Sequence, residues 1–206
     1  MIRVADVVPT TTAEGPGRRY AIWVQGCTIR CDGCFNPHMW SKTGGALRSV
    51  GELLARIEAV DVEGITLLGG EPFEQGHALS VLGEAVQRRG LSVMTFTGYD
   101  YDHLTGRDAP DEAQALLGAT DLLVTGPYVA ESPDLVRPWV GSTNQEFHFL
   151  TERYGHLQEH LVDLRDRVEV RVAPDGAVAV NGWAGVAQLD DLLEDLGRPV
   201  GRGRVR

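Results

Sequence analysis

The stretch RYAIWVQGCTIRCDGC, residues 19–34, contains the pattern from which the fold assignment starts. Its first six residues, 19–24, are mostly apolar and β-prone, which predicts a buried strand. This strand leads directly into Cys27, Cys31 and Cys34, the only cysteines in the 206-residue chain. Reactive side chains just after a strand are typical of α/β proteins, whose chemistry lies at the carboxyl ends of parallel strands.

Strand and helix patterns alternate beyond this stretch. Short apolar runs bounded by turn residues predict strands at 64–70, 91–99 and 121–126. Helical spacing of apolar residues predicts helices at 50–60, 77–90 and 111–119, and Ser49 is placed to cap the first of them. The alternation predicts βαβ units and a parallel sheet, either open or curled into a partial barrel, with the residues after each strand on one rim.

Composition limits the classes of protein that fit. The net charge of −10 disfavours binding to nucleic acid or to an anionic membrane. We expect no signal peptide, because no basic start precedes a long apolar run, and no membrane span, because no run reaches about 18 apolar residues. An odd number of clustered cysteines favours a reducing cytoplasmic compartment and metal or redox chemistry over disulfides.

Two kinds of metal site compete for the cysteines. The spacing C-x₃-C-x₂-C suits three corners of a cubane 4Fe-4S cluster, which leaves one iron open to a small molecule. A structural zinc ion needs a fourth ligand, for which His38 is the candidate. Three unrelated buried cysteines are the third possibility.

Two segments together resemble the radical S-adenosylmethionine superfamily. They are GCTIRCDGCFN, residues 26–36, and LLGGEPF, residues 67–73. The resemblance implies that Cys27, Cys31 and Cys34 are the catalytic residues and metal ligands, and that they hold a 4Fe-4S cluster. It also implies that the methionyl group of S-adenosyl-L-methionine chelates the fourth iron.

The same resemblance assigns a cofactor site at the end of the second strand. Glycines allow close approach of the backbone, and carbonyl and carboxylate oxygens suit the ammonium group of the cofactor. A side chain at Gly70 is therefore expected to displace the cofactor while leaving the cluster in place. The implied cofactor-binding residues are Gly69, Gly70, Glu71, Pro72 and Thr97.

Five segments in order narrow the resemblance to the anaerobic ribonucleotide reductase activating proteins, a family of glycyl-radical activating enzymes. They lie within residues 14–150. The first begins EGPGRRYAIWV, and the other four are LLGGEPF, TFTGY, LVTGPYV and WVGSTNQEFHFL. The family implies an incomplete (β/α) barrel that is open to a loop of a partner protein. It also implies reductive cleavage of S-adenosylmethionine to a 5′-deoxyadenosyl radical, which takes hydrogen from a glycine backbone of a glycyl radical enzyme. Reduced flavodoxin or ferredoxin is the implied electron donor.

Alternatives to this function remain open. One is a radical enzyme of the same mechanism that modifies a peptide or a small metabolite, and another is a non-catalytic iron–sulfur or zinc-binding protein. Thr125 and Pro127 stand where family members often carry aspartate and lysine, so the rim that faces a partner is expected to differ. We expect docking at residues 14–17, Tyr128 and residues 141–145.

The chain is expected to divide into two parts. Residues 1–150 form the radical S-adenosylmethionine partial-barrel domain, and residues 151–206 form a C-terminal extension. The extension is predicted to contain a helix at 151–167, a β-hairpin at 168–183 around a Pro-Asp-Gly turn, an acidic helix at 186–197 and a basic tail.

Overall fold

The computed structural model describes residues 1–164, 168–172, 175–176, 178–182 and 194. The strands are β1 (Ile2–Thr11), β2 (Arg19–Val24), β3 (Ala46–Arg48), β4 (Gly64–Gly69), β5 (Ser92–Phe96), β6 (Leu122–Thr125), β7 (Glu146–Phe149), β8 (Val168–Val172) and β9 (Val178–Gly182). The α-helices are α1 (Val50–Glu58), α2 (Gly76–Gln87), α3 (Tyr101–Thr105) and α4 (Ala113–Gly118). Short 3₁₀ helices are η1 (Pro37–Met39), η2 (Pro72–Gln75), η3 (Glu152–Leu157) and η4 (Leu161–Asp163).

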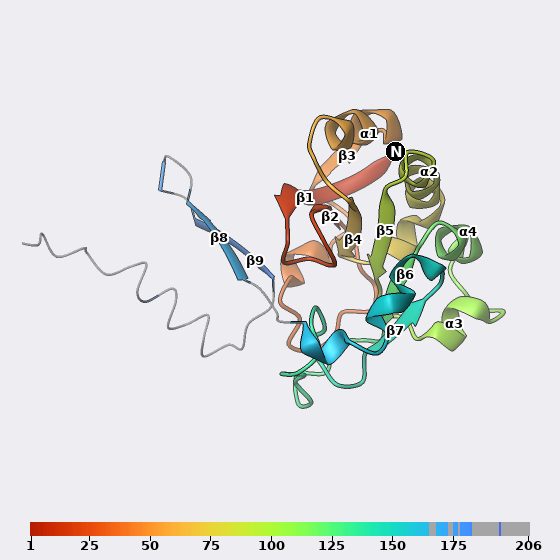
Figure 1. Ribbon diagram of the computed structural model, residues 1–206, viewed down its shortest axis with the longest axis vertical. Helices are drawn as coiled ribbons and strands as arrows, with labels where there is room; N and C mark the ends of the chain where they lie inside the picture. Colours follow the sequence, from red (N-terminus) through yellow and green to blue (C-terminus); the bar gives the residue numbers. More distant parts are fainter. Residues whose placement is uncertain (165–167, 173–174, 177, 183–193, 195–206) are drawn as a thin grey trace, which may run out of the picture.

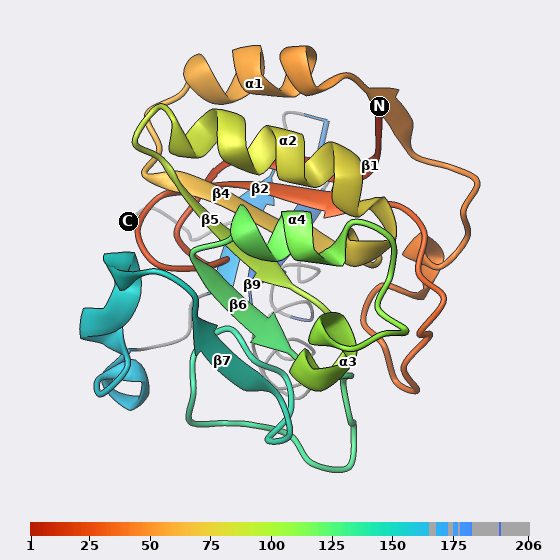
Figure 2. The same cartoon turned by 90° about the vertical axis from the view of Figure 1, so that its right-hand side faces the viewer.

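Seven strands form one mixed sheet in the order β3-β1-β2-β4-β5-β6-β7 (Figure 2). The four central strands β2, β4, β5 and β6 run parallel, as the alternating pattern predicts. The antiparallel strands β1 and β3 at one edge and β7 at the other were not predicted from the sequence. The fold is therefore α/β with a sheet that is parallel at its centre and antiparallel at its edges.

Different structural elements pack on the two faces of the sheet. Helices α1, α2 and α4 lie across one face, where Ile22 and Leu67 join the main core cluster (Figures 1 and 2). Alternate residues of the same strands, such as Trp23 and Leu68, point to the opposite face because side chains along a strand alternate. This second face is left to loops and to the β8–β9 hairpin (Figure 1).

Ser49 caps α1 as predicted, since its side chain accepts a hydrogen bond from the Glu52 backbone N–H. The predicted α-helix over 151–167 is wrong, because η3 and η4 replace it. Two tethers fix the start of this segment: Thr151 Oγ1 donates to Asp121 at 2.8 Å, and Tyr154 Oη accepts from Arg19 at 3.0 Å. These tertiary contacts override the helical pattern.

The chain beyond η4 contains the antiparallel hairpin β8–β9, in which Val168 lies opposite Gly182. The acidic helix predicted at 186–197 and the basic tail fall outside the described residues, except for position 194. None of the helices in the described part of the chain has both the length and the apolar character needed to cross a bilayer.

Candidate active site

The cysteine loop begins where β2 ends and is closed at its base by backbone hydrogen bonds. Gly26 N–H donates to the Met39 carbonyl at 2.8 Å, and Cys27 N–H donates to the Trp40 carbonyl at 3.1 Å. The side chain of Gln25 adds a bond to the carbonyl of Ser41 at 2.8 Å. Residues 27–40 therefore form a closed loop fixed to the carboxyl end of a fully buried strand.

The glycine-rich turn after β4 lies against this loop. Gly70 N–H donates to the Val24 carbonyl and Glu71 N–H to the Gly26 carbonyl, both at 2.8 Å. Gly69 has φ +103°, a conformation that glycine adopts without strain. A Cβ on Gly70 would lie 2.3 Å from the Gly26 carbonyl oxygen. The turn and the cysteine loop thus meet backbone to backbone.

Glu71 is buried and bridges two strand ends. One carboxylate oxygen accepts from Thr97 Oγ1 at 2.8 Å and from Phe73 N–H at 2.9 Å, and the other accepts from Gly98 N–H at 3.0 Å. Burial raises the pKa of Glu71 to about 7, although these hydrogen bonds act in the opposite direction. Glu71 therefore ties the turn after β4 to the turn after β5, a structural role not anticipated from the sequence.

One small cavity gathers most of the residues that the sequence singled out. It measures about 150 Å³, and its walls include Cys27, Cys31, Cys34, Gly69, Gly70, Glu71 and Thr97. Pro72 is buried at the start of η2 instead. The three cysteines are free thiols. Burial raises the pKa of Cys27 and of Cys31, which keeps these thiols protonated until a metal displaces the proton.

The donor set fits an iron–sulfur cluster. Trp40 lines the same cavity, and its buried indole N–H has no hydrogen-bond partner among the described residues. Hydrogen bonds to cluster sulfurs are a common tuning device, so this N–H suits a sulfur-rich occupant. Over the described residues, no three His, Cys, Asp or Glu side chains are gathered closely enough for a single metal ion. His38, the candidate zinc ligand, lines a second, larger cavity, which of the three cysteines only Cys34 also lines.

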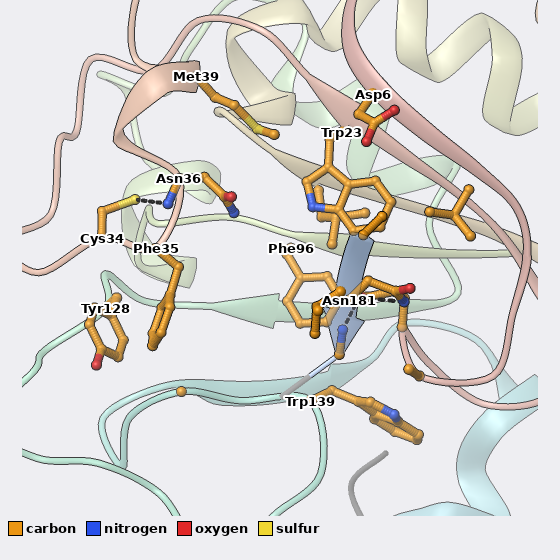
Figure 3. A pocket seen from close by; sticks show the side chains of 18 of the residues that line it. Asp6, Trp23, Cys34, Phe35, Asn36, Met39, Phe96, Tyr128, Trp139 and Asn181 are labelled. Atoms are coloured by element: carbon orange, nitrogen blue, oxygen red, sulfur yellow. Dashed lines mark hydrogen bonds between the residues drawn. The ribbon is translucent and has the colours of Figure 1, made fainter. Parts of the chain in front are cut away.

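A larger cavity of about 550 Å³ adjoins the first on the face of the sheet opposite the helices (Figure 3). Cys34, Phe96, Tyr128 and Gln145 line both cavities. Trp23, Phe96 and Trp139 give the larger cavity aromatic walls. A volume of this size is typical of ligand sites.

The residues expected to dock a partner come together here. Glu14, Tyr128, Gly141 and Gln145 all line the larger cavity. Thr125, one of the departures from the family pattern, is only 2% exposed and shares a 2.9 Å hydrogen bond with His148. That departure therefore lies inside the sheet and not on the rim.

Besides Trp40, two residues that shape the site were not identified from the sequence. Glu74 accepts a hydrogen bond from Thr28 N–H at 2.7 Å, which fixes the start of the cysteine loop. Asn181 comes from the hairpin and lines the larger cavity. Glu74 follows the glycine-rich turn closely enough to have been suspected, whereas the sequence around Asn181 carries no such signal.

Comparison with known proteins agrees with this geometry. The family profile described as a 4Fe-4S single cluster domain matches residues 13–148, so the chain belongs to that class of iron–sulfur protein. An anaerobic ribonucleoside-triphosphate reductase-activating protein of Vibrio cholerae is 33% identical over 69% of this chain and 95% of that protein. The protein of the same name in Haemophilus influenzae is 30% identical over 68% of this chain and 93% of its own length. The chain belongs to the family of these activating proteins, which confirms the resemblance found in the sequence.

A solved structure, QueE from Escherichia coli, covers 47% of this chain and 52% of its own length at 24% identity, with a TM-score of 0.40.

The contact between Gly70 and Gly26 changes what we expect from substitution. Gly70→Ala should lose the cluster as well as the cofactor, because its Cβ would push the Gly26 carbonyl and the adjoining Cys27 out of place. Iron and sulfide content after anaerobic reconstitution measures the effect. Gly51→Ala is the control, since a Cβ there meets nothing within 4 Å. Full iron content in Gly70→Ala would contradict the backbone argument.

The indole N–H of Trp40, which has no hydrogen-bond partner among the described residues, gives a second prediction. Trp40→Phe keeps an aromatic ring and removes the N–H, so the more negative reduced cluster loses stabilisation. The reduction potential should fall by on the order of tens of millivolts. Trp139→Phe makes the same chemical change in the larger cavity and should leave the potential unchanged. Equal potentials in Trp40→Phe and the parent chain would show that this N–H does not reach the cluster.

Proposed function

We propose that this chain is a glycyl-radical activating enzyme of the radical S-adenosylmethionine type. The observation that carries the proposal is that one cavity brings three free cysteines against a glycine-rich turn and opens toward a larger aromatic cavity. Its relatives are named as activating proteins of an anaerobic ribonucleoside-triphosphate reductase. The proposed substrate is accordingly a glycine of such a reductase.

Each set of residues has a proposed task. Cys27, Cys31 and Cys34 hold three irons of the cluster, and the carbonyls around Gly69 and Gly70 receive the ammonium group of S-adenosylmethionine. Glu71 adds a negative charge beneath that group. Thr97 holds the Glu71 carboxylate in place through its 2.8 Å hydrogen bond. The hydrogen bond from the Gly70 amide to the Val24 carbonyl keeps the two halves of the site at a fixed separation.

A 4Fe-4S cluster held by Cys27, Cys31 and Cys34 would supply one electron, drawn from reduced flavodoxin or ferredoxin, to cleave S-adenosylmethionine into methionine and a 5′-deoxyadenosyl radical. Such a radical would take a hydrogen atom from the glycine Cα, giving 5′-deoxyadenosine and a glycyl radical. The protein contributes positioning, because the glycine has to lie in near contact with the reacting carbon. The aromatic walls of the larger cavity would limit the access of water to this contact.

The architecture supports two further parts of the proposal. We infer that the mixed sheet is the incomplete barrel of the superfamily, with residues 1–150 carrying the radical chemistry. Residues 151–206 are then an extension that serves the substrate side. The family profile ends at residue 148, close to this proposed boundary.

Isotope transfer tests the function directly. The anaerobically reconstituted chain, S-adenosylmethionine, dithionite and the anaerobic reductase of the same organism should give a doublet radical signal by paramagnetic resonance. Deuterating the glycines of that reductase should move deuterium into 5′-deoxyadenosine. Absence of 5′-deoxyadenosine in every condition would reject radical chemistry. Deuterium arriving only from a peptide side chain or a metabolite would favour the alternative substrate class.

The buried carboxylate at Glu71 predicts how cofactor binding depends on pH. Its pKa is raised from 4.5 to about 7, so the group becomes neutral as the pH falls through about 7 and attracts the ammonium group less. Affinity for S-adenosylmethionine should fall roughly several-fold from about pH 8 to about pH 6. The contribution of this group to apoprotein stability has the opposite trend: it is fully present below 4.5 and lost as the pH rises through about 7.

Thr97→Val sharpens that test. The substitution removes a hydrogen bond that lowers the pKa of Glu71, so the midpoint of the affinity profile should move to higher pH. Calorimetric titration of the unreduced, reconstituted protein measures both profiles. Identical affinity across the range would leave Glu71 as a tether between turns and nothing more.

A further inference from the structure

The β8–β9 hairpin lies beyond the part of the chain that the family shares. The family profile ends at residue 148, and the Vibrio cholerae relative is matched over 95% of its length using only 69% of this chain. The hairpin nevertheless lies beside the face of the sheet opposite the helices, which we call the open face (Figure 1). It supplies Arg171, Ala179 and Asn181 to the wall of the larger cavity.

The register of the hairpin explains which side chains face the cavity. Asn181 lies opposite Glu169, and Ala179 lies opposite Arg171. Residues that lie opposite one another in an antiparallel pair project from the same face, as do alternate residues of one strand. These four side chains therefore share the face that is turned toward the sheet.

Hydrogen bonds fasten this face to the segment that precedes β2. One oxygen of Glu14 accepts from Asn181 Nδ2 at 3.1 Å and from Gly182 N–H at 2.7 Å. Glu169 accepts from the backbone N–H of Thr12 at 2.7 Å and from its hydroxyl at 3.0 Å. The Glu14 carbonyl in turn accepts from Thr66 Oγ1 at 2.7 Å, which places the segment over the middle of β4.

Asn181 has one polar atom that these contacts leave unused. The side chain is 7% exposed, and its Nδ2 donates to Glu14 and also to Thr11 Oγ1 at 3.0 Å. The opposite orientation of the amide would set its oxygen against the Glu14 carboxylate, so the neighbours fix the assignment. Its Oδ1 is buried and, within the described ranges, accepts no hydrogen bond. A buried acceptor of this kind calls for a donor from a ligand.

The surroundings define that donor. Figure 3 shows Asn181 in the same cavity as Phe96 and Trp139. Arg171 shares the cavity wall with the carboxylates of Asp6 and Glu14, so charges of both signs are already present there. The buried Asn181 Oδ1, set among aromatic rings, suits a neutral N–H donor. A backbone amide beside a glycine, which has no side chain to obstruct the approach, supplies such a donor.

We propose that the β8–β9 hairpin is the outer wall of the substrate site and that Asn181 Oδ1 accepts a hydrogen bond from a backbone N–H of the glycine-bearing peptide segment. The inference rests on the proposed function, since it takes the substrate to be a protein loop. Asn181 positions that loop and takes no part in cofactor cleavage. The hairpin thereby adds a substrate contact from outside the segment that the family profile matches.

A coupling experiment on the full-length reconstituted protein tests the hydrogen bond. The probes are synthetic peptides that copy the glycine-bearing segment of the reductase, with each amide in turn replaced by an ester, which removes one N–H. In the parent chain, one ester position should weaken peptide binding about three- to tenfold. In Asn181→Ala the same ester should cost nothing further, because its acceptor is already gone.

Glu169→Ala is the matched control. It loosens the hairpin at Thr12 but keeps Asn181 Oδ1, so it should retain the full sensitivity to that ester. Formation of 5′-deoxyadenosine without peptide should be equal in the parent chain and Glu169→Ala; its complete absence from the parent chain would instead count against the proposed function. Failure of the peptide to bind the parent chain, or an ester effect that survives in Asn181→Ala, would overturn the inference.

Discussion

The site depends on one short contact between two chain segments that are far apart in sequence. Glu71 N–H donates to the Gly26 carbonyl, and Gly70 N–H donates to the Val24 carbonyl. These bonds continue the parallel ladder of β2 and β4 past the ends of both strands. Only glycine at position 70 leaves room for the contact, because any Cβ would overlap the Gly26 carbonyl. The cysteine loop and the glycine-rich turn are therefore positioned by the sheet itself.

The sheet separates stability from chemistry. One face carries the main core beneath α1, α2 and α4, and side chains such as Leu67 and Leu79 there are fully buried. The other face bears Trp23 and Phe96, which line the larger cavity. Because side chains alternate along each strand, a single strand serves both purposes. Variation on the open face can thus alter what binds while the helical face keeps the fold.

The sequence predicted the elements whose pattern is local. The central parallel strands are buried on both faces and therefore appear as continuous apolar runs. β1 was missed because Asp6 interrupts its apolar pattern and its pairing with β2 is irregular at two places. The three cysteines and the glycine-rich turn were predicted to lie together, and they line one cavity. Trp40 and Asn181 could not be found in this way, since an unpartnered buried atom is a property of tertiary packing.

Glu14 is a residue whose position is predictable from the sequence but whose contacts are not. It lies in the EGPG segment, residues 14–17, which was expected from the sequence to dock a partner, and nothing local distinguishes its carboxylate. In the structure its backbone carbonyl accepts a hydrogen bond from Thr66 of β4. Its carboxylate accepts hydrogen bonds from Asn181 and Gly182 of the hairpin. Burial raises the pKa of Glu14, and the donors from the hairpin oppose that rise. The hairpin donors favour the charged form of Glu14, and the carboxylate in turn fastens the hairpin beside the larger cavity.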